Sequence, residues 1–292
     1  MRQLVAGLTI ANSWMAWSEP KDFPYMQVGP DPGFGDVSAL PYRHHNHKIP
    51  YGDHPDQFGL LWLPDAGLPA EKPTIVLVHG GCWLNAYDIS HTRALATALA
   101  LAGHPVWNLE YRRADENTSA WPASLQDLQQ GIIAMQQLAE HGVRDDDVIV
   151  VGHSAGGHLA LLLAASWPQV YDRKTPVLSV VGLAAITDIA RYAQGDNSCQ
   201  QATTLFMGGA PDDIPDDYAA ANPARLRVDV PITLLHGDGD QIVPRDQFEG
   251  LRGGNIRRVL DPGAGHFDWI HPGTPAFGTL LRVLAQPDGD SA

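Results

Sequence analysis

Short apolar runs alternate with stretches of helical periodicity along the chain from residue 58 onward. The runs are rich in Val, Ile and Leu, and they are continuously apolar rather than alternating with polar residues. A strand with that pattern is buried on both faces, as in a parallel sheet covered by helices. The candidate strands span residues 58–63, 74–78, 106–109, 148–151, 179–183 and 231–235.

Helical patterns fill the segments between these runs. Apolar residues recur at helical spacing over 124–141, which ends at Gly142 as a helix C-cap would. Residues 155–166 are small and apolar nearly all round, which predicts a buried helix. Further helices are expected over 91–102 and 274–285. Strands that alternate with helices predict right-handed crossovers and a doubly wound α/β sheet in one domain.

Three segments lie outside this alternation. Residues 1–48 are expected to form an N-terminal arm, and the Pro-, Gly- and His-rich stretch 18–56 is predicted to be irregular. Residues 187–230 are too long for an ordinary connection between two strands, so we predict an insertion of short helices that serves as a small lid. The polar tail 286–292 is expected to fray.

The charge balance excludes two classes of partner. The 33 acidic residues exceed the 19 basic ones, which gives a formal net charge of −14. Such an excess repels phosphate backbones and anionic lipids, so neither nucleic acid nor a membrane is expected as a partner. The apolar stretch 4–11 only faintly resembles a secretory signal, because one positive charge precedes it and no small-residue cleavage site follows. We therefore expect a cytoplasmic protein, with secretion as the alternative.

The cysteines and the clustered histidines do not predict a metal site. Cys82 and Cys199 are too few for a disulfide scaffold and lack the paired spacing of a zinc site. We expect Cys82 to be a buried thiol rather than one half of a disulfide, since its loop has another predicted role. The histidines within 43–47 have no third-ligand pattern and are interpreted as part of a solvated arm. No metal and no cofactor are expected.

Residues 152–156, Gly-His-Ser-Ala-Gly, fit the G-x-S-x-G pattern of a nucleophile elbow. The pattern alone is weak, because glycine-rich turns between a strand and a helix are common. Here it follows a predicted buried strand and precedes a predicted apolar helix, which is the context that the elbow requires. The turn would expose the Ser154 hydroxyl and aim the helix N-terminus at nearby negative charge. Ser154 is therefore the candidate nucleophile.

A second loop, His-Gly-Gly-Cys-Trp at 79–83, ends the predicted strand 74–78. Glycines let the backbone turn its amides, rather than side chains, toward a substrate carbonyl oxygen. The N–H groups of Gly81 and Cys82, together with that of Ala155, are the candidate oxyanion hole.

Other roles for neighbouring side chains follow from position. Trp83 follows the predicted oxyanion residues and His153 precedes Ser154, so both are candidate substrate-binding residues. A nucleophilic Cys82 is disfavoured, because no helix or histidine pattern activates it. His158, one helical turn beyond Ser154, is interpreted as a packing residue.

Asp240 and His266 are the candidates to complete a catalytic triad. A carboxylate in the turn after the strand at 231–235 can fix the tautomer of a histidine. Asp240 and Asp238 both lie in that turn, and the family resemblance described below favours Asp240, with Asp238 as the alternative. His266 lies in a loop of small residues, with His271 as the alternative. The order Ser, Asp, His along the chain is the one that the α/β-hydrolase fold requires.

These motifs resemble the α/β-hydrolases grouped around kynurenine formamidase, the hormone-sensitive-lipase-like esterases and the feruloyl-esterase-like (BD-FAE) hydrolases. The resemblance covers residues 49–285. It implies a mostly parallel eight-stranded sheet with helices on both faces, the usual triad roles, and neither cofactor nor metal. The arm departs from the family pattern and is expected to cover the mouth of the site or to form a homodimer contact. Further matching segments are 49–52, 110–112, 121–123 and 236–240.

The expected function is a serine hydrolase that cleaves small carboxylic esters through an acyl-enzyme. An arylformamidase that cleaves N-formylkynurenine or a similar amide is an alternative, supported by the H-G-G-x-W form of the loop 79–83. An amidase or peptidase of the prolyl-oligopeptidase type is a lesser alternative, because no propeller domain precedes the core. A non-catalytic binding protein is the remaining alternative, since a fold does not guarantee activity.

Overall fold

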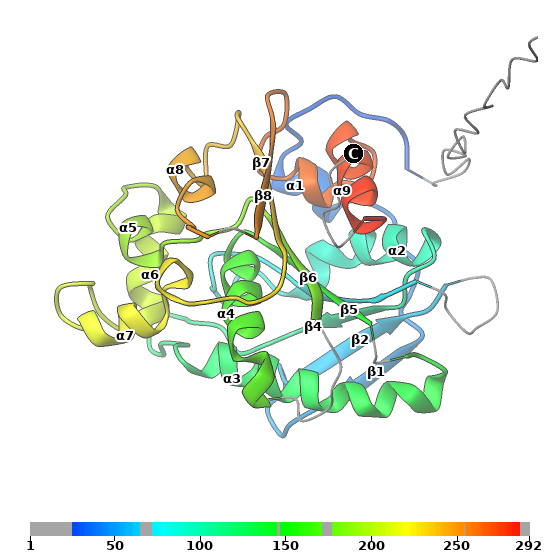
Figure 1. The fold of residues 1–292 in the computed structure, drawn as a ribbon, viewed down its shortest axis with the longest axis horizontal. Helices are drawn as coiled ribbons and strands as arrows, with labels where there is room; N and C mark the ends of the chain where they lie inside the picture. Colours follow the sequence, from blue (N-terminus) through cyan, green and yellow to red (C-terminus); the bar gives the residue numbers. More distant parts are fainter. Residues whose placement is uncertain (1–24, 65–71, 145–146, 171–176, 254, 287–292) are drawn as a thin grey trace, which may run out of the picture.

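A computed structural model describes residues 25–64, 72–144, 147–170, 177–253 and 255–286. Eight strands form one sheet in the order β1-β2-β4-β3-β5-β6-β7-β8 (Figure 1). Strand β2 (Phe58–Trp62) is antiparallel to both neighbours, β1 (His47–Pro50) and β4 (Val106–Leu109). The other neighbouring pairs are parallel, which confirms the predicted mostly parallel sheet. Its remaining strands are β3 (Thr74–Val78), β5 (Val148–His153), β6 (Val177–Leu183), β7 (Ile232–Gly237) and β8 (Ile256–Asp261).

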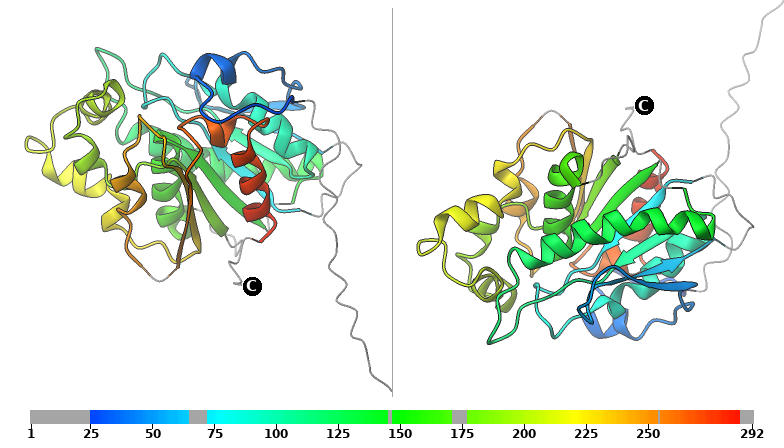
Figure 2. Two further views of the ribbon diagram at one scale, coloured as in Figure 1. Left: turned by 90° about the horizontal axis from the view of Figure 1, so that it is seen from above. Right: turned by 90° about the horizontal axis from the view of Figure 1, so that it is seen from below.

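Alternate residues of the central strands face two separate apolar cores. In β3, Val76 and Val78 belong to one core, whereas Ile75 and Leu77 belong to the other. Helices cover both faces of the sheet, which is why the strands are continuously apolar. The first core is closed by α3 (Ala123–Ile133), η2 (Ala134–His141) and α4 (Ala155–Val170), and the second by α2 (Arg93–Leu101) and α9 (Pro275–Leu284) (Figure 2).

The helices between the strands follow the sequence predictions. The segment predicted as a helix at 124–141 forms α3 and then the 3₁₀ helix η2, and Gly142 caps it with φ of 75°. The short 3₁₀ helix η1 (Ile89–Thr92) leads into α2. None of the helices in the described residues is both long and apolar enough to span a bilayer.

The insertion contains short helices, as predicted. They are α5 (Ile189–Tyr192), α6 (Ser198–Met207), α7 (Pro215–Ala220) and η3 (Pro223–Arg225), and they gather on one side of the sheet (Figure 1). Two more single-turn helices, α8 (Arg245–Phe248) and η4 (Asp268–Ile270), follow β7 and β8.

The prediction that 18–56 is irregular holds for most of the segment's described part but is wrong at two short elements. The segment contains α1 (Phe34–Ser38) as well as strand β1, so the core fold begins before residue 49. Helix α1 is a single turn and β1 is a short edge strand, and elements this short carry no apolar period that a sequence could show. The predicted signal-like stretch 4–11 and all but the first residue of the tail 286–292 lie outside the described residues.

The strand order places two loops together at one edge of the sheet. The connection that leaves β3 runs to β4 on one side, and the connection that leaves β5 runs to β6 on the other side. The two connections therefore diverge. In an open α/β sheet, the carboxyl ends of such strands border the usual ligand-binding crevice. The loop 79–83 and the turn at Ser154 follow β3 and β5.

Candidate active site

Ser154 lies in a strained, crowded turn between β5 and α4. Its φ is 57°, in the left-handed region that non-glycine residues rarely adopt. A Cβ on Gly152 would lie 2.3 Å from the carbonyl oxygen of Gly156, and a Cβ on Gly156 would lie 2.2 Å from that of His79. The turn therefore needs glycine two residues before and two residues after the serine, which is the geometry of a nucleophile elbow.

The loop 79–83 packs against this turn. A Cβ on Gly80 would lie 3.1 Å from the Cβ of Ser154. Three consecutive residues of the loop have positive φ, 102° at Gly81, 52° at Cys82 and 58° at Trp83. Within the described part of the chain, no hydrogen bond engages the backbone N–H of Gly81 or Cys82.

Ala155 supplies a third backbone donor beside the same serine. It is the first residue of α4, and the first N–H groups of a helix have no acceptor within the helix. The three predicted donors are therefore free to bind an oxyanion, and the helix dipole adds to their field. Their role in an oxyanion hole stays a prediction.

Asp240 and His266 are joined by a hydrogen bond. His266 Nδ1 lies 2.8 Å from Asp240 Oδ2, and the Asp240 side chain is fully buried. The other carboxylate oxygen accepts the backbone N–H groups of Ile242 and Val243, each at 2.8 Å. Burial acts to raise the pKa of Asp240, but the His266 charge and these hydrogen bonds together lower it. Asp240 is therefore a charged acceptor that can hold the His266 ring in one tautomer.

The two alternatives from the sequence have other partners. Asp238 faces solvent and accepts from Arg245 Nη1 at 3.1 Å. His271 accepts the backbone N–H of Gly273 on its Nδ1 at 3.1 Å. The structure thus joins the preferred pair and separates the alternatives from it.

His153, a predicted substrate-binding residue, has a hydrogen-bond partner within the protein. Its side chain is buried, and Nε2 lies 3.0 Å from the carbonyl oxygen of His266. The two imidazole rings are 4.7 Å apart between centroids. Because His153 immediately precedes Ser154, it connects the elbow to the loop of the candidate base. The His153 side chain is thus bonded to the backbone of the candidate base, and its role in binding substrate stays a prediction.

Trp83 is likewise placed away from its predicted role. Its side chain is fully buried and stacks on Phe206 of α6, with ring centroids 4.8 Å apart. The Trp83 and His158 rings are also packed edge-on, with their centroids 5.4 Å apart. His158 itself bonds through Nε2 to the carbonyl oxygen of Ala221, which confirms its packing role. The indole thus packs the insertion against the elbow helix.

Cys82 and Cys199 form a disulfide, so the predicted free thiol is wrong. Their sequence separation of 117 residues gave no sign of the pairing. Only the docking of α6 over the loop 79–83 brings the two side chains together. The bond leaves the backbone N–H of Cys82 available while it ties the candidate oxyanion loop to the insertion.

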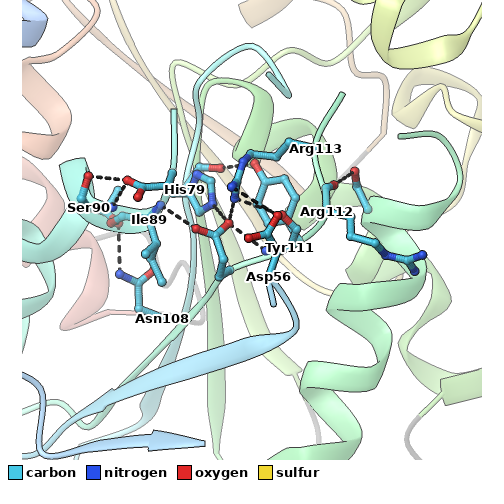
Figure 3. Close-up of polar contacts among 12 residues, drawn as sticks. Asp56, His79, Ile89, Ser90, Asn108, Tyr111, Arg112 and Arg113 are labelled. Carbon is cyan, nitrogen blue, oxygen red and sulfur yellow. Dashed lines mark hydrogen bonds and ion pairs between the residues drawn. The ribbon is translucent and has the colours of Figure 1, made fainter. Parts of the chain in front are cut away.

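A buried cluster of charged and polar side chains contacts the loop 79–83 at His79, and the sequence analysis missed it (Figure 3). Glu110 lies 2.8 Å from His79 Nε2, pairs with Arg113, and accepts the backbone N–H of Ile89 at 2.9 Å. The Tyr111 hydroxyl donates to the carbonyl oxygen of His79 at 2.7 Å. The signal available in the sequence was a run of three polar residues, 110–112, directly after the predicted strand 106–109. By itself this run did not indicate a role.

The chemistry available here is that of a serine, an imidazole, a carboxylate and backbone N–H groups. No group of three or more His, Cys, Asp or Glu residues in the described ranges could hold a metal ion. The predicted absence of a metal and of a cofactor stays a prediction.

The family model of BD-FAE matches residues 61–253, a range that includes Ser154 and Asp240 and ends before His266. Two curated relatives from Mycobacterium tuberculosis are each 25% identical. The probable carboxylic ester hydrolase LipM aligns over 71% of this chain and 51% of its own, and the carboxylesterase/phospholipase LipF over 73% and 60%. The chain thus spans about half the length of LipM.

Solved structures share the fold at low sequence identity. Esterase B from Lactobacillus rhamnosis superposes with a TM-score of 0.71 at 20% identity, over 86% of this chain and 89% of that chain. The fold is therefore that of the α/β-hydrolases, as predicted.

Proposed function

The chain belongs to the BD-FAE family, and on that premise we propose that it is a serine hydrolase that cleaves small carboxylic esters. The observation that carries the proposal is the buried Asp240–His266 hydrogen bond in the same chain as a strained serine elbow. The names of the relatives, an ester hydrolase and a carboxylesterase, support the ester as the bond that is cleaved.

In the proposed acylation step, the Ser154 oxygen attacks the ester carbonyl carbon while its proton passes to His266 Nε2. Asp240 accepts from the opposite nitrogen, Nδ1, and stabilises the imidazolium that forms. The tetrahedral intermediate then collapses, the alcohol leaves with the proton from His266, and the acyl group remains on Ser154. Water activated by His266 releases the acid by the same steps in reverse order.

The negative charge of each tetrahedral intermediate lies on the former carbonyl oxygen. We assign its binding to the backbone N–H groups of Gly81, Cys82 and Ala155, which need no reorganisation because loop and helix fix them. One such donor is worth about 3 kcal/mol of transition-state stabilisation.

The reported relatives do not support the arylformamidase alternative, because they are named as ester hydrolases. Its sequence support, the tryptophan of the H-G-G-x-W loop, is a buried packing residue in the structure. No observation favours the peptidase alternative or the non-catalytic one. The homodimer stays a prediction.

The test is kcat/KM for p-nitrophenyl butyrate beside N-formyl-L-kynurenine, with Ser154→Ala as the blank. We expect hydrolysis of the butyrate that Ser154→Ala abolishes. Preference for the formyl amide would replace the proposal by arylformamidase activity. Absence of hydrolysis and of labelling by a fluorophosphonate would favour a binding protein.

A further inference from the structure

The arm segment 25–40, which lies outside the family match, is docked on the core domain. The N–H of Val28 donates to the carbonyl oxygen of Gly273 at 3.0 Å. The Tyr25 hydroxyl donates to the carbonyl oxygen of Ala94 at 3.1 Å, and the Val37 side chain is buried. Helix α1 lies beside the chain that follows β8 (Figure 1 and the left view of Figure 2). The segment therefore has a fixed place on the domain.

One carboxylate joins this segment to the loop of the candidate base. Asp268 Oδ2 accepts the backbone N–H of Asp31 at 2.9 Å and that of Gly265 at 2.8 Å. A Cβ on Gly265 would lie 2.2 Å from the Asp31 carboxylate. Because Gly265 immediately precedes His266, the arm touches the backbone that carries the imidazole.

Phe34, the first residue of α1, lies among aromatic rings from two loops of the site. Its ring centroid is 5.3 Å from that of Tyr87 in an edge-on arrangement and 5.8 Å from that of Phe267. The residue nevertheless remains 37% exposed. An aromatic ring held by its neighbours but still open to solvent can bind an apolar ligand group without first being ordered.

Phe34 has a third ring neighbour, His91 at 5.7 Å, and the other two, Tyr87 and Phe267, each contact a residue of the proposed mechanism. Tyr87 packs on Gly81, since a Cβ there would lie 2.4 Å from the Tyr87 Cβ. The Phe267 ring lies edge-on to the His266 ring, 5.0 Å between centroids. Through these two neighbours, Phe34 lies between the candidate oxyanion loop and the loop that carries His266.

We propose that Phe34 is a specificity-determining residue that binds an apolar or aromatic alcohol portion of the ester. This inference rests on the proposed esterase function. The leaving oxygen must come within hydrogen-bond reach of His266 Nε2 to receive its proton, so the alcohol lies on the side of His266. Phe34 contacts Phe267, and Phe267 packs on His266. The exposed ring of Phe34 therefore lies on the same side of the site as the alcohol.

The test compares wild type, Phe34→Ala and the control Met26→Ala, which truncates an 84% exposed apolar side chain of the same segment. We would measure kcat/KM for ethyl, hexyl and benzyl butyrate. A second series varies the acyl chain of p-nitrophenyl esters from acetate to octanoate. Phe34→Ala should lower kcat/KM for the benzyl and hexyl esters about fivefold to tenfold and leave ethyl butyrate within about twofold. Met26→Ala should leave these ratios unchanged.

Two outcomes would overturn the inference. An equal loss for all three butyrates would mean that Phe34 only supports the fold. A change confined to the acyl series would place the ring on the other side of the carbonyl.

A binding measurement separates this inference from the proposed function. The Kd of uncleaved benzyl butyrate is measured by calorimetry in Ser154→Ala and in Ser154→Ala/Phe34→Ala. We expect binding about fivefold to tenfold weaker without the ring, a result that would stand even if wild type cleaved no ester. Equal Kd values, or no binding in either variant, would refute the role of Phe34.

Discussion

The imidazole of His153 donates from Nε2 to the carbonyl oxygen of His266, at a distance of 3.0 Å. The residue before the candidate nucleophile therefore holds the backbone of the candidate base. Burial, and after it the His266 charge, lower the pKa of His153 well below its usual value. The ring is neutral near pH 7, with its one proton on the nitrogen that makes this bond.

Removing this bond should reduce catalysis more than stability. We expect His153→Ala to lower kcat for p-nitrophenyl butyrate about tenfold to a hundredfold, since small displacements of a catalytic group have costs of that size. The matched control is His104→Ala, which removes another buried imidazole bonded to a carbonyl oxygen, that of Pro73. A similar fall in kcat for both variants would show that His153 acts only through stability.

The two aspartates of the turn after β7 should differ sharply. Asp240→Asn should lower kcat by about three to four orders of magnitude, because an amide cannot hold the required tautomer of His266. Asp238→Asn should leave kcat within about twofold, since Asp238 is half-exposed and pairs with Arg245. Circular dichroism would verify the fold of both. The reverse order of effects would show that the wrong acid has been assigned.

The Cys82–Cys199 bond should stabilise the fold and the candidate oxyanion loop together. Peptide mapping without reductant should recover the linked pair. Dithiothreitol should lower Tm and kcat of wild type and should leave the double variant Cys82→Ser/Cys199→Ser unaffected. A disulfide of this kind contributes about 2–4 kcal/mol to the free energy of unfolding. An unchanged Tm on reduction would mean that packing alone holds the insertion.

The Cys82–Cys199 disulfide also bears on the compartment in which the protein resides. Disulfides persist in oxidising compartments and are rare where glutathione and thioredoxin keep thiols reduced. The cytoplasmic location expected from the sequence stays a prediction; because of the bond, we propose its alternative, secretion, as the location to test.

Glu110 is expected to be a stability determinant of the loop 79–83. Glu110→Gln removes the more buried of the two carboxylates that pair with Arg113 and leaves only Asp56 at 3.5 Å, and breaking a buried pair in this way costs about 3–5 kcal/mol. Urea denaturation should show this loss, while the exposed Glu116→Gln should remain within about 0.5 kcal/mol of wild type. Equal unfolding free energies for the two variants would contradict the prediction.

Stability should fall as the solution becomes acidic below about pH 6.5. Burial lowers the pKa of His91 to about 3, and those of His104 and His158 to about 4, from the ordinary value of 6.5. As the pH falls through 6.5, the unfolded chain takes up protons that the folded protein does not, so unfolding becomes favoured. The stabilisation is therefore present above about pH 6.5 and is lost progressively toward pH 4.

Each of these groups contributes up to about 1.4 kcal/mol per pH unit within that window. We would measure the free energy of unfolding in urea at several values between pH 8 and pH 4.5. His104→Ala should show a shallower slope because one titrating group is gone. A free energy independent of pH, or an unchanged slope in the variant, would refute the assignment.

The main strands and helices, and the order of the candidate triad along the chain, could be predicted from the sequence alone. Continuous apolar runs such as 74–78 and 148–151 identified buried strands, because both faces of a covered parallel sheet exclude water. Glycine at 152 and 156 marked the elbow, because backbone packing there leaves no room for a Cβ. Local sterics and burial act on neighbouring residues, so these features can be read along the chain.

Contacts between side chains that are far apart in the sequence could be found only in the folded protein. It joined Cys82 to Cys199, directed His153 to the backbone of His266, buried Trp83 under α6 and set Phe34 between two loops of the site. A contact between distant residues depends on how whole elements dock, and docking is decided by packing that no local pattern records. For that reason the sequence placed the candidate triad but missed the residues that position and surround it.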